Sequence, residues 1–202
     1  MSAQTLCLEV AVSTAKEPTI FEPFQKQTHQ SLMTLPGFVQ GIPLRGLGDP
    51  ASRADLILWD SATAAKSAAA VIQSDVRFSS FMEGIESVRH FAHYDGASSA
   101  AMQHLTECAI IEISAYEAAP SSKVSQLRPA IHKALRDMKG ASPQIAGTCI
   151  DTQSALIDVI GWDAKATHQA APNLLIEHHP ELKPFFSDMG KVNIFELFEV
   201  VV

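Results

Sequence analysis

The chain has 202 residues, of which 47% are hydrophobic, so it is long enough to fold around a substantial apolar core. Its formal net charge of −7 leaves no cluster of basic residues, so we do not expect nucleic acid as a partner. No apolar run is long enough to cross a bilayer, and residues 1–11 lack the pattern of a secretory leader. The three cysteines have no metal-like spacing and are expected to be free thiols. We therefore expect a cytoplasmic protein without membrane contact.

The sequence repeats itself after 103 positions, the separation between Trp59 and Trp162, which are its two tryptophans. The same shift aligns these pairs: Glu9 with Glu112, His29 with His132, Leu32 with Leu135, Gly37 with Gly140, Ile42 with Ile145, Asp55 with Asp158, and Asp60 with Asp163. With one further residue inserted, Phe81 falls on Phe185 and Phe91 on Phe195. Because one register spans nearly the whole chain, we infer a tandem duplication.

The first elements can be read in both copies. Residues 6–12 alternate between strongly and weakly apolar side chains, which predicts a strand, and residues 111–113 repeat the pattern. Apolar residues at helical spacing then predict a helix over 21–35 and its counterpart over 124–138. Gly37 and Gly140 follow as helix-ending glycines.

The remaining elements follow in the same order in each copy. We predict strands at 38–44 and 55–59, joined by a turn rich in glycine and proline. A second helix is predicted over 62–83 in the first copy and 164–189 in the second. The last strands are predicted at 87–94 and 192–201.

This order, β-α-β-β-α-β, is that of a ferredoxin-like unit, whose antiparallel sheet carries helices on one face only. We therefore predict an α+β protein with a first unit at 1–95, a linker at 96–104 and a second unit at 105–202. Packing the two open sheet faces together gives a pseudo-dimeric α/β barrel within one chain. Any homodimer is then expected to form through outer helices or strand edges.

Each copy resembles the dimeric α/β-barrel superfamily, which includes antibiotic biosynthesis monooxygenases and stress-responsive A/B barrel proteins. The resemblance rests on a third strand that ends in Trp59-Asp60 or Trp162-Asp163, and on the alanine-rich start and aromatic end of the next helix. It implies a pocket between the sheet and helices that includes the tryptophan. It also implies that His168 matches a histidine that many members carry early in this helix, where the first copy has Ala65.

Four histidines are candidates for proton transfer, because the ordinary pKa of histidine suits acid–base catalysis near neutral pH. They are His29, His90, His132 and His168. For His29 and His132, beside the apolar stripe of the first helix, we favour a structural, hydrogen-bonded role. The candidate substrate-binding residues are aromatic and also suit core packing: Trp59, Phe81, Tyr94, Trp162 and Phe185.

Two matched carboxylates, Glu9 and Glu112, lie opposite Leu8 and Ile111 on their strands. We expect them to point between the two sheets and to serve the barrel rather than the pocket. A functional pocket should instead combine Trp59 or Trp162 with polar residues that only one copy has: His90, His93 and Tyr94, or His168 and His178.

The sequence favours a cofactor-independent, monooxygenase-like activity on a small apolar molecule, with no cofactor and no metal site. His178 and His179 are adjacent on a helix and cannot chelate one ion together. A non-catalytic binding or stress-related protein is the first alternative. The second is a haem-binding barrel, because chlorite dismutase-like relatives bind haem through one helical histidine.

Overall fold

The computed structural model describes residues 6–119 and 122–201, and each copy contains the predicted elements in the predicted order. The first copy comprises β1 (Cys7–Ala15), α1 (Pro18–Leu32), β2 (Phe38–Gly46), β3 (Ser52–Trp59), α2 (Ala62–Ser74), α3 (Ser79–Gly84) and β4 (Ile85–Tyr94). The second comprises β5 (Ile110–Ala118), α5 (Val124–Asp137), β6 (Ala141–Thr148), β7 (Ala155–Trp162), α6 (Lys165–His178), α7 (Lys183–Asp188) and β8 (Met189–Val200). A short helix, α4 (Ser99–Leu105), lies between the copies.

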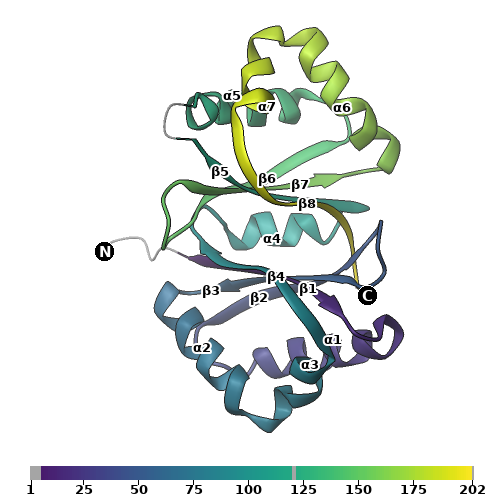
Figure 1. Cartoon of the computed structure of the whole chain (residues 1–202), viewed down its shortest axis with the longest axis vertical. Helices are drawn as coiled ribbons and strands as arrows, with labels where there is room; N and C mark the ends of the chain where they lie inside the picture. The colour runs from purple at the N-terminus through teal and green to yellow at the C-terminus, as the bar shows by residue number, and fades with distance from the viewer. Residues whose placement is uncertain (1–5, 120–121, 202) are drawn as a thin grey trace.

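The two copies stack as two ferredoxin-like units, with their sheets facing each other and their helices outside (Figure 1). The strand order is β4-β1-β3-β2 in the first unit and β8-β5-β7-β6 in the second. The registers also match, since Trp59 lies opposite Cys7 and Trp162 opposite Ile110. The predicted α+β fold is confirmed, with the tryptophans on equivalent strands.

The two units are joined along both edges of the barrel. On one side β2 pairs with β8 over Leu44–Gly46, which merges the strands into one eight-stranded sheet. On the other side a single bridge links Tyr94 to Cys149, so the barrel is not closed by a full ladder there. No helix in the described part of the chain is long and apolar enough to span a membrane.

The main core lies between the two sheets. It takes alternate residues of each strand, such as Leu8 and Val10 from β1 and Ile111 and Ile113 from β5, all fully buried. The intervening strand residues face the helices and form one smaller core in each unit.

The segment predicted as a linker contributes to this main core. Within it, α4 lies between the sheets (Figure 1) and buries Ala101, Met102 and Leu105 there. Ser98 caps the helix by accepting a hydrogen bond from the Ala101 amide. The sequence did not reveal this helix, because small residues next to a few apolar ones are typical of a short amphipathic helix and of a linker alike.

Truncating the Met102 side chain, on the buried face of α4, tests the contribution of this helix to stability. We expect Met102→Ala to lower the free energy of unfolding by about 2–5 kcal/mol, because this fully buried side chain would leave a cavity between the sheets. Gln103→Ala, on the exposed side of the same turn, should change it by less than about 0.5 kcal/mol. Urea denaturation measures the free energy of unfolding of both variants. If Met102→Ala lowers it as little as Gln103→Ala does, α4 only connects the two units and does not stabilise the core.

The second helix of each copy is shorter than predicted. In the first copy α2 ends at Ser74, because Asp75 adopts an extended conformation and caps a new turn through the Arg77 amide. In the second copy α6 ends at His178, and a 3₁₀ turn begins at Pro180. The resulting bends carry α3 and α7 back over the sheet, where each closes one end of a pocket.

Candidate functional site

Each unit contains an apolar pocket between its sheet and its helices. The first has a volume of about 240 Å³ and is lined by Glu9, Ala11, Ser13, Thr28, His29, Leu32, Asp55, Ile57, Ala69, Ile72, Gln73, Phe81, Met82, Ile85, Val88 and Phe91. The second, of about 420 Å³, is lined by Glu112, Ser114, Tyr116, Ile131, His132, Leu135, Asp158, Ile160, Trp162, His168, Ala171, Pro172, Leu175, Phe185, Phe186, Met189, Val192 and Phe195. The two sets largely coincide under the internal repeat, so the duplicated unit carries a duplicated pocket.

The prediction that Glu9 and Glu112 point between the sheets is wrong. Both line the pockets on the helix side, while Leu8 and Ile111 face the inter-sheet core. The inter-sheet space is packed mainly with apolar side chains, where an unpaired carboxylate would be costly. On the helix side each carboxylate meets a histidine: Glu9 Oε2 lies 3.2 Å from His93 Nε2, and Glu112 Oε2 lies 3.1 Å from His168 Nε2.

At one end of the second pocket, Asp158 on β7 is the centre of a buried polar cluster. Its Oδ1 lies 2.6 Å from His132 Nε2 and accepts a hydrogen bond from Arg128 Nε at 2.8 Å. Its Oδ2 accepts a hydrogen bond from the Tyr116 hydroxyl at 2.6 Å. The helix α5 supplies His132 and Arg128 from positions four residues apart, which lie on one helical face.

The cluster keeps the Asp158 carboxylate charged. Burial alone would raise its pKa, but the hydrogen bond with His132 and the charge of Arg128 outweigh that effect and hold the pKa below its usual value. Arg128 is itself fixed by hydrogen bonds from Nη2 to the carbonyl oxygens of Gly147 and Ile157.

The same pocket holds a second histidine–carboxylate pair. Glu112 Oε1 accepts a hydrogen bond from Ser114 Oγ at 2.9 Å, and Oε2 contacts His168 as described. The His168 ring meets Trp162 edge-on, with ring centroids 5.2 Å apart. His168 Nδ1 and Trp162 Nε1 are buried and have no hydrogen-bond partner among the described residues. Both atoms are closed off from solvent, so a ligand reaches them only if a neighbouring side chain moves aside.

The first pocket keeps part of this arrangement. His29 Nε2 lies 2.7 Å from Asp55 Oδ1, and Gln25 donates to the same oxygen at 2.9 Å, where the second unit has Arg128. Ser13 takes the position of Tyr116, and Ala65 takes that of His168. The first unit therefore has one histidine–carboxylate pair at this end and none at the helix α2.

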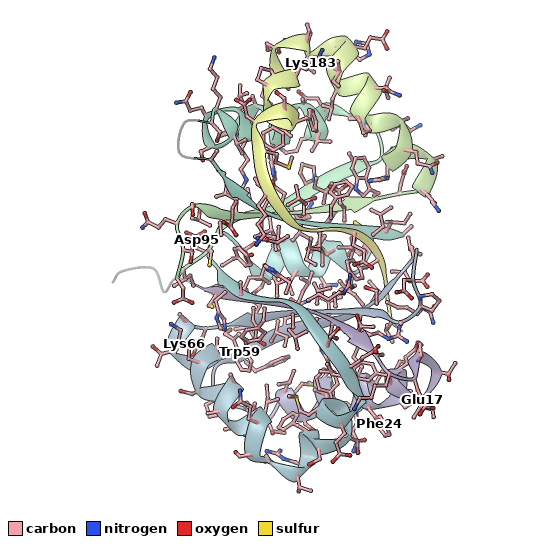
Figure 2. The ribbon with its side chains drawn as sticks, viewed as in Figure 1. Glu17, Phe24, Trp59, Lys66, Asp95 and Lys183 are labelled. Atoms are coloured by element: carbon pink, nitrogen blue, oxygen red, sulfur yellow. The ribbon has the colours of Figure 1, made fainter. Side chains whose placement is uncertain are left out.

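The predicted site residues divide between four places. His29 and Phe81 line the first pocket, and His132, Trp162, His168 and Phe185 line the second. Trp59 packs behind the first pocket instead, fully buried between the sheet and α2 (Figure 2). His90 and Tyr94 lie on the inter-sheet face of β4, where His90 Nε2 is 2.9 Å from the Tyr94 hydroxyl, at a cleft beside Cys149.

Sequence analysis missed Tyr116 and Asp158, which line the second pocket, and Arg128, which donates a hydrogen bond to Asp158 from outside that lining. A signal for Asp158 was present, because an aspartate recurs in both copies of an otherwise apolar strand. For Tyr116 and Arg128 the repeat gives no signal, since the first copy has Ser13 and Gln25.

Both tyrosines of the chain should resist ionisation in the native state. Burial raises the pKa of Tyr116 above its usual 10.0, and the Asp158 charge raises it further; burial also raises the pKa of Tyr94. A raised pKa contributes stability that is complete below pH 10 and is lost as the pH rises above it. We therefore expect no phenolate absorbance in native protein at pH 10, whereas the urea-unfolded chain should titrate normally. Native titration near pH 10 would contradict the burial of both hydroxyls.

Among the described residues no group of three or more histidine, cysteine or acidic side chains could hold a metal ion. No protein-family model and no curated protein sequence matches the chain. The comparisons that do match are with solved structures, and they concern the fold.

Several solved structures, including the following three, are similar over essentially the whole chain. An "anthrone oxidase-like protein" has a TM-score of 0.71 at 12% identity, covering 100% of this chain and 93% of its own. The "putative monooxygenase" of Fusobacterium nucleatum has a TM-score of 0.70 at 9% identity, and the match covers 100% of this chain and 94% of the monooxygenase chain. A chlorite dismutase mutant from Candidatus Nitrospira defluvii has a TM-score of 0.63 at 7% identity, covering 99% and 92%. The chain thus has the dimeric α/β-barrel fold in its fused, two-unit form.

Proposed function

We propose that the pocket of the second unit oxidises a small, largely apolar molecule with molecular oxygen and without a cofactor. The observation that carries the proposal is the His168–Glu112 pair in the pocket wall: Glu112 holds Nε2, so the unpartnered Nδ1 is the nitrogen that accepts a proton once a neighbouring side chain moves aside. Two of the structural neighbours are named as monooxygenase or oxidase proteins, which supports this reaction class.

The pocket suits a substrate that supplies its own electrons. Its walls are mostly aliphatic and aromatic, and the carboxylates of Glu112 and Asp158 are both already paired with histidines. Such walls bind an uncharged ring system, and few polar groups remain to orient it. An activated methylene between two aromatic rings, as in anthrone, has the required acidity.

The reaction balances without another reactant. His168 removes one proton from the methylene, and the carbanion passes its electrons to oxygen as a carbon–peroxide bond forms. Loss of the second methylene proton then breaks the oxygen–oxygen bond. The products are the ketone and one water for each oxygen molecule consumed.

The resemblance to chlorite dismutase-like proteins raises the possibility of haem binding. The histidines of the two pockets do not fit haem. His29, His132 and His168 each present Nε2 to a carboxylate. Their Nδ1 atoms adjoin the Cβ carbon, and this leaves little room for a planar macrocycle. We therefore derive no step through haem.

An oxygen-electrode assay with anthrone tests the proposal. We expect saturable oxygen uptake above the spontaneous rate, with one anthraquinone formed per oxygen and no hydrogen peroxide. Binding of anthrone without uptake would favour the non-catalytic alternative. A Soret band after haem addition, accompanied by anthrone inactivity, would favour the haem alternative.

A further inference from the structure

We propose that the pocket of the first unit is a second ligand site, which binds a small uncharged apolar molecule without reacting with it. This goes beyond the oxidation proposed for the second unit. The pocket is a concave space of about 240 Å³ whose walls include Leu32, Ile57, Ile72 and Phe81. Mostly apolar cavities with a few polar groups are the usual form of small-molecule sites.

Two small side chains line this pocket. Ser13 and Ala69 line it, at positions where the second unit has Tyr116 and Pro172. These positions can therefore hold larger side chains in this fold.

The charges in the lining favour an uncharged ligand. Its two carboxylates are buried and already paired, Glu9 with His93 at 3.2 Å and Asp55 with His29 at 2.7 Å. No cationic lysine or arginine lines the pocket among the described residues. An anionic ligand would meet two carboxylates, and a cationic one would have to displace a histidine.

The first pocket has no base equivalent to His168. That position is Ala65, and the remaining histidine of the lining, His29, comes from α1 and is paired with Asp55. Asp55 holds Nε2, and Nδ1 packs so closely on β2 that a Cβ atom at Gly41 would lie 2.6 Å away. The geometry therefore supports binding but not proton abstraction.

The two tryptophans report on the two pockets separately. Trp59 packs against Leu32 and Ile57 behind the first pocket, and Trp162 lines the second. We would titrate the Trp162→Phe chain and the Trp59→Phe chain with 2-naphthol, following tryptophan quenching. Equilibrium dialysis of the unchanged chain would count the bound molecules, and we expect two per chain.

Filling the first pocket provides the decisive comparison. We expect Ala69→Phe, from α2, and Ala11→Leu, from β1, each to reduce the count to one and to remove the response of Trp59. A filling variant of the second pocket, Ala171→Phe, should remove the response of Trp162 instead. One 2-naphthol per unchanged chain, or a count unaffected by both filling variants in folded protein, would overturn the proposal.

The outcome is separate from that of the oxygenase assay. Two bound molecules together with no oxygen uptake from anthrone would leave this second site standing and reject the proposed oxidation. Oxygen uptake from anthrone together with only one bound 2-naphthol per chain would support the proposed oxidation and reject the second site.

Discussion

Asp158→Ala is expected to lower the free energy of unfolding by about 3–5 kcal/mol, because it leaves the buried Arg128 guanidinium without its carboxylate partner. It also removes the hydrogen-bond acceptor of Tyr116 and His132. The matched change in the first unit, Asp55→Ala, should cost only about 1–3 kcal/mol, because its hydrogen-bonding partner from the same position as Arg128 is the neutral Gln25. Urea denaturation followed by circular dichroism measures both losses.

Two controls separate charge from packing in this experiment. Adding Arg128→Met to Asp158→Ala should restore part of the lost stability, since the uncompensated charge disappears with the guanidinium.

The depressed pKa of Asp158 makes a contribution to the stability of the fold. This contribution is present above the usual pKa of 3.8 and is lost as the pH falls through the lower pKa of the folded state. The stability of Asp158→Ala should therefore fall less between pH 5 and pH 2 than that of the unchanged protein. Equal costs for Asp158→Ala and Asp55→Ala would contradict the role given to Arg128.

His168→Ala is expected to lower kcat for anthrone oxidation by about 10²–10⁴-fold, the usual contribution of a positioned general base. The side chain is 15% exposed and pairs with the buried Glu112, so circular dichroism must first show that the variant is folded. Glu112→Gln should give a smaller loss, because the amide still fixes the ring but no longer stabilises its charged form. Oxygen uptake at saturating anthrone measures both variants.

Imidazole added to the His168→Ala protein distinguishes a base from a structural role. A free base that enters the vacated space should restore part of the uptake, and the restored rate should rise with imidazole concentration. The matched control is Ala69→Phe, which lies in the first pocket and should retain full uptake. A normal rate for His168→Ala would reject this residue as the base.

The duplication made the fold predictable from one sequence. Each strand and helix could be read twice, and the aligned Trp59 and Trp162 fixed which strands are equivalent. What failed were the features that alternation alone cannot decide. Both faces of each sheet are covered, so a period of two shows that Glu9 and Leu8 face opposite ways without showing which of them faces the other sheet.

The site was harder to predict because its contacts join distant parts of the chain. The spacing of the chain cannot show that Glu112 on β5 meets His168 on α6, or that Tyr116 meets Asp158 on β7. The emphasis on residues present in one copy was useful for His168, which does share a pocket with Trp162. The same reasoning selected His90 and Tyr94, which lie on the inter-sheet face of β4 and line neither of the two pockets.

The short connection through α4 also has a consequence for protein concentration. A barrel assembled from two separate chains exists only above its dissociation constant, so its cores come apart on dilution. Here the second unit is tethered beside the first at an effective concentration of about millimolar or more, whatever the amount of protein present. The inter-sheet core, with Met102 buried in it, should therefore persist in a cell that makes very few copies of this chain.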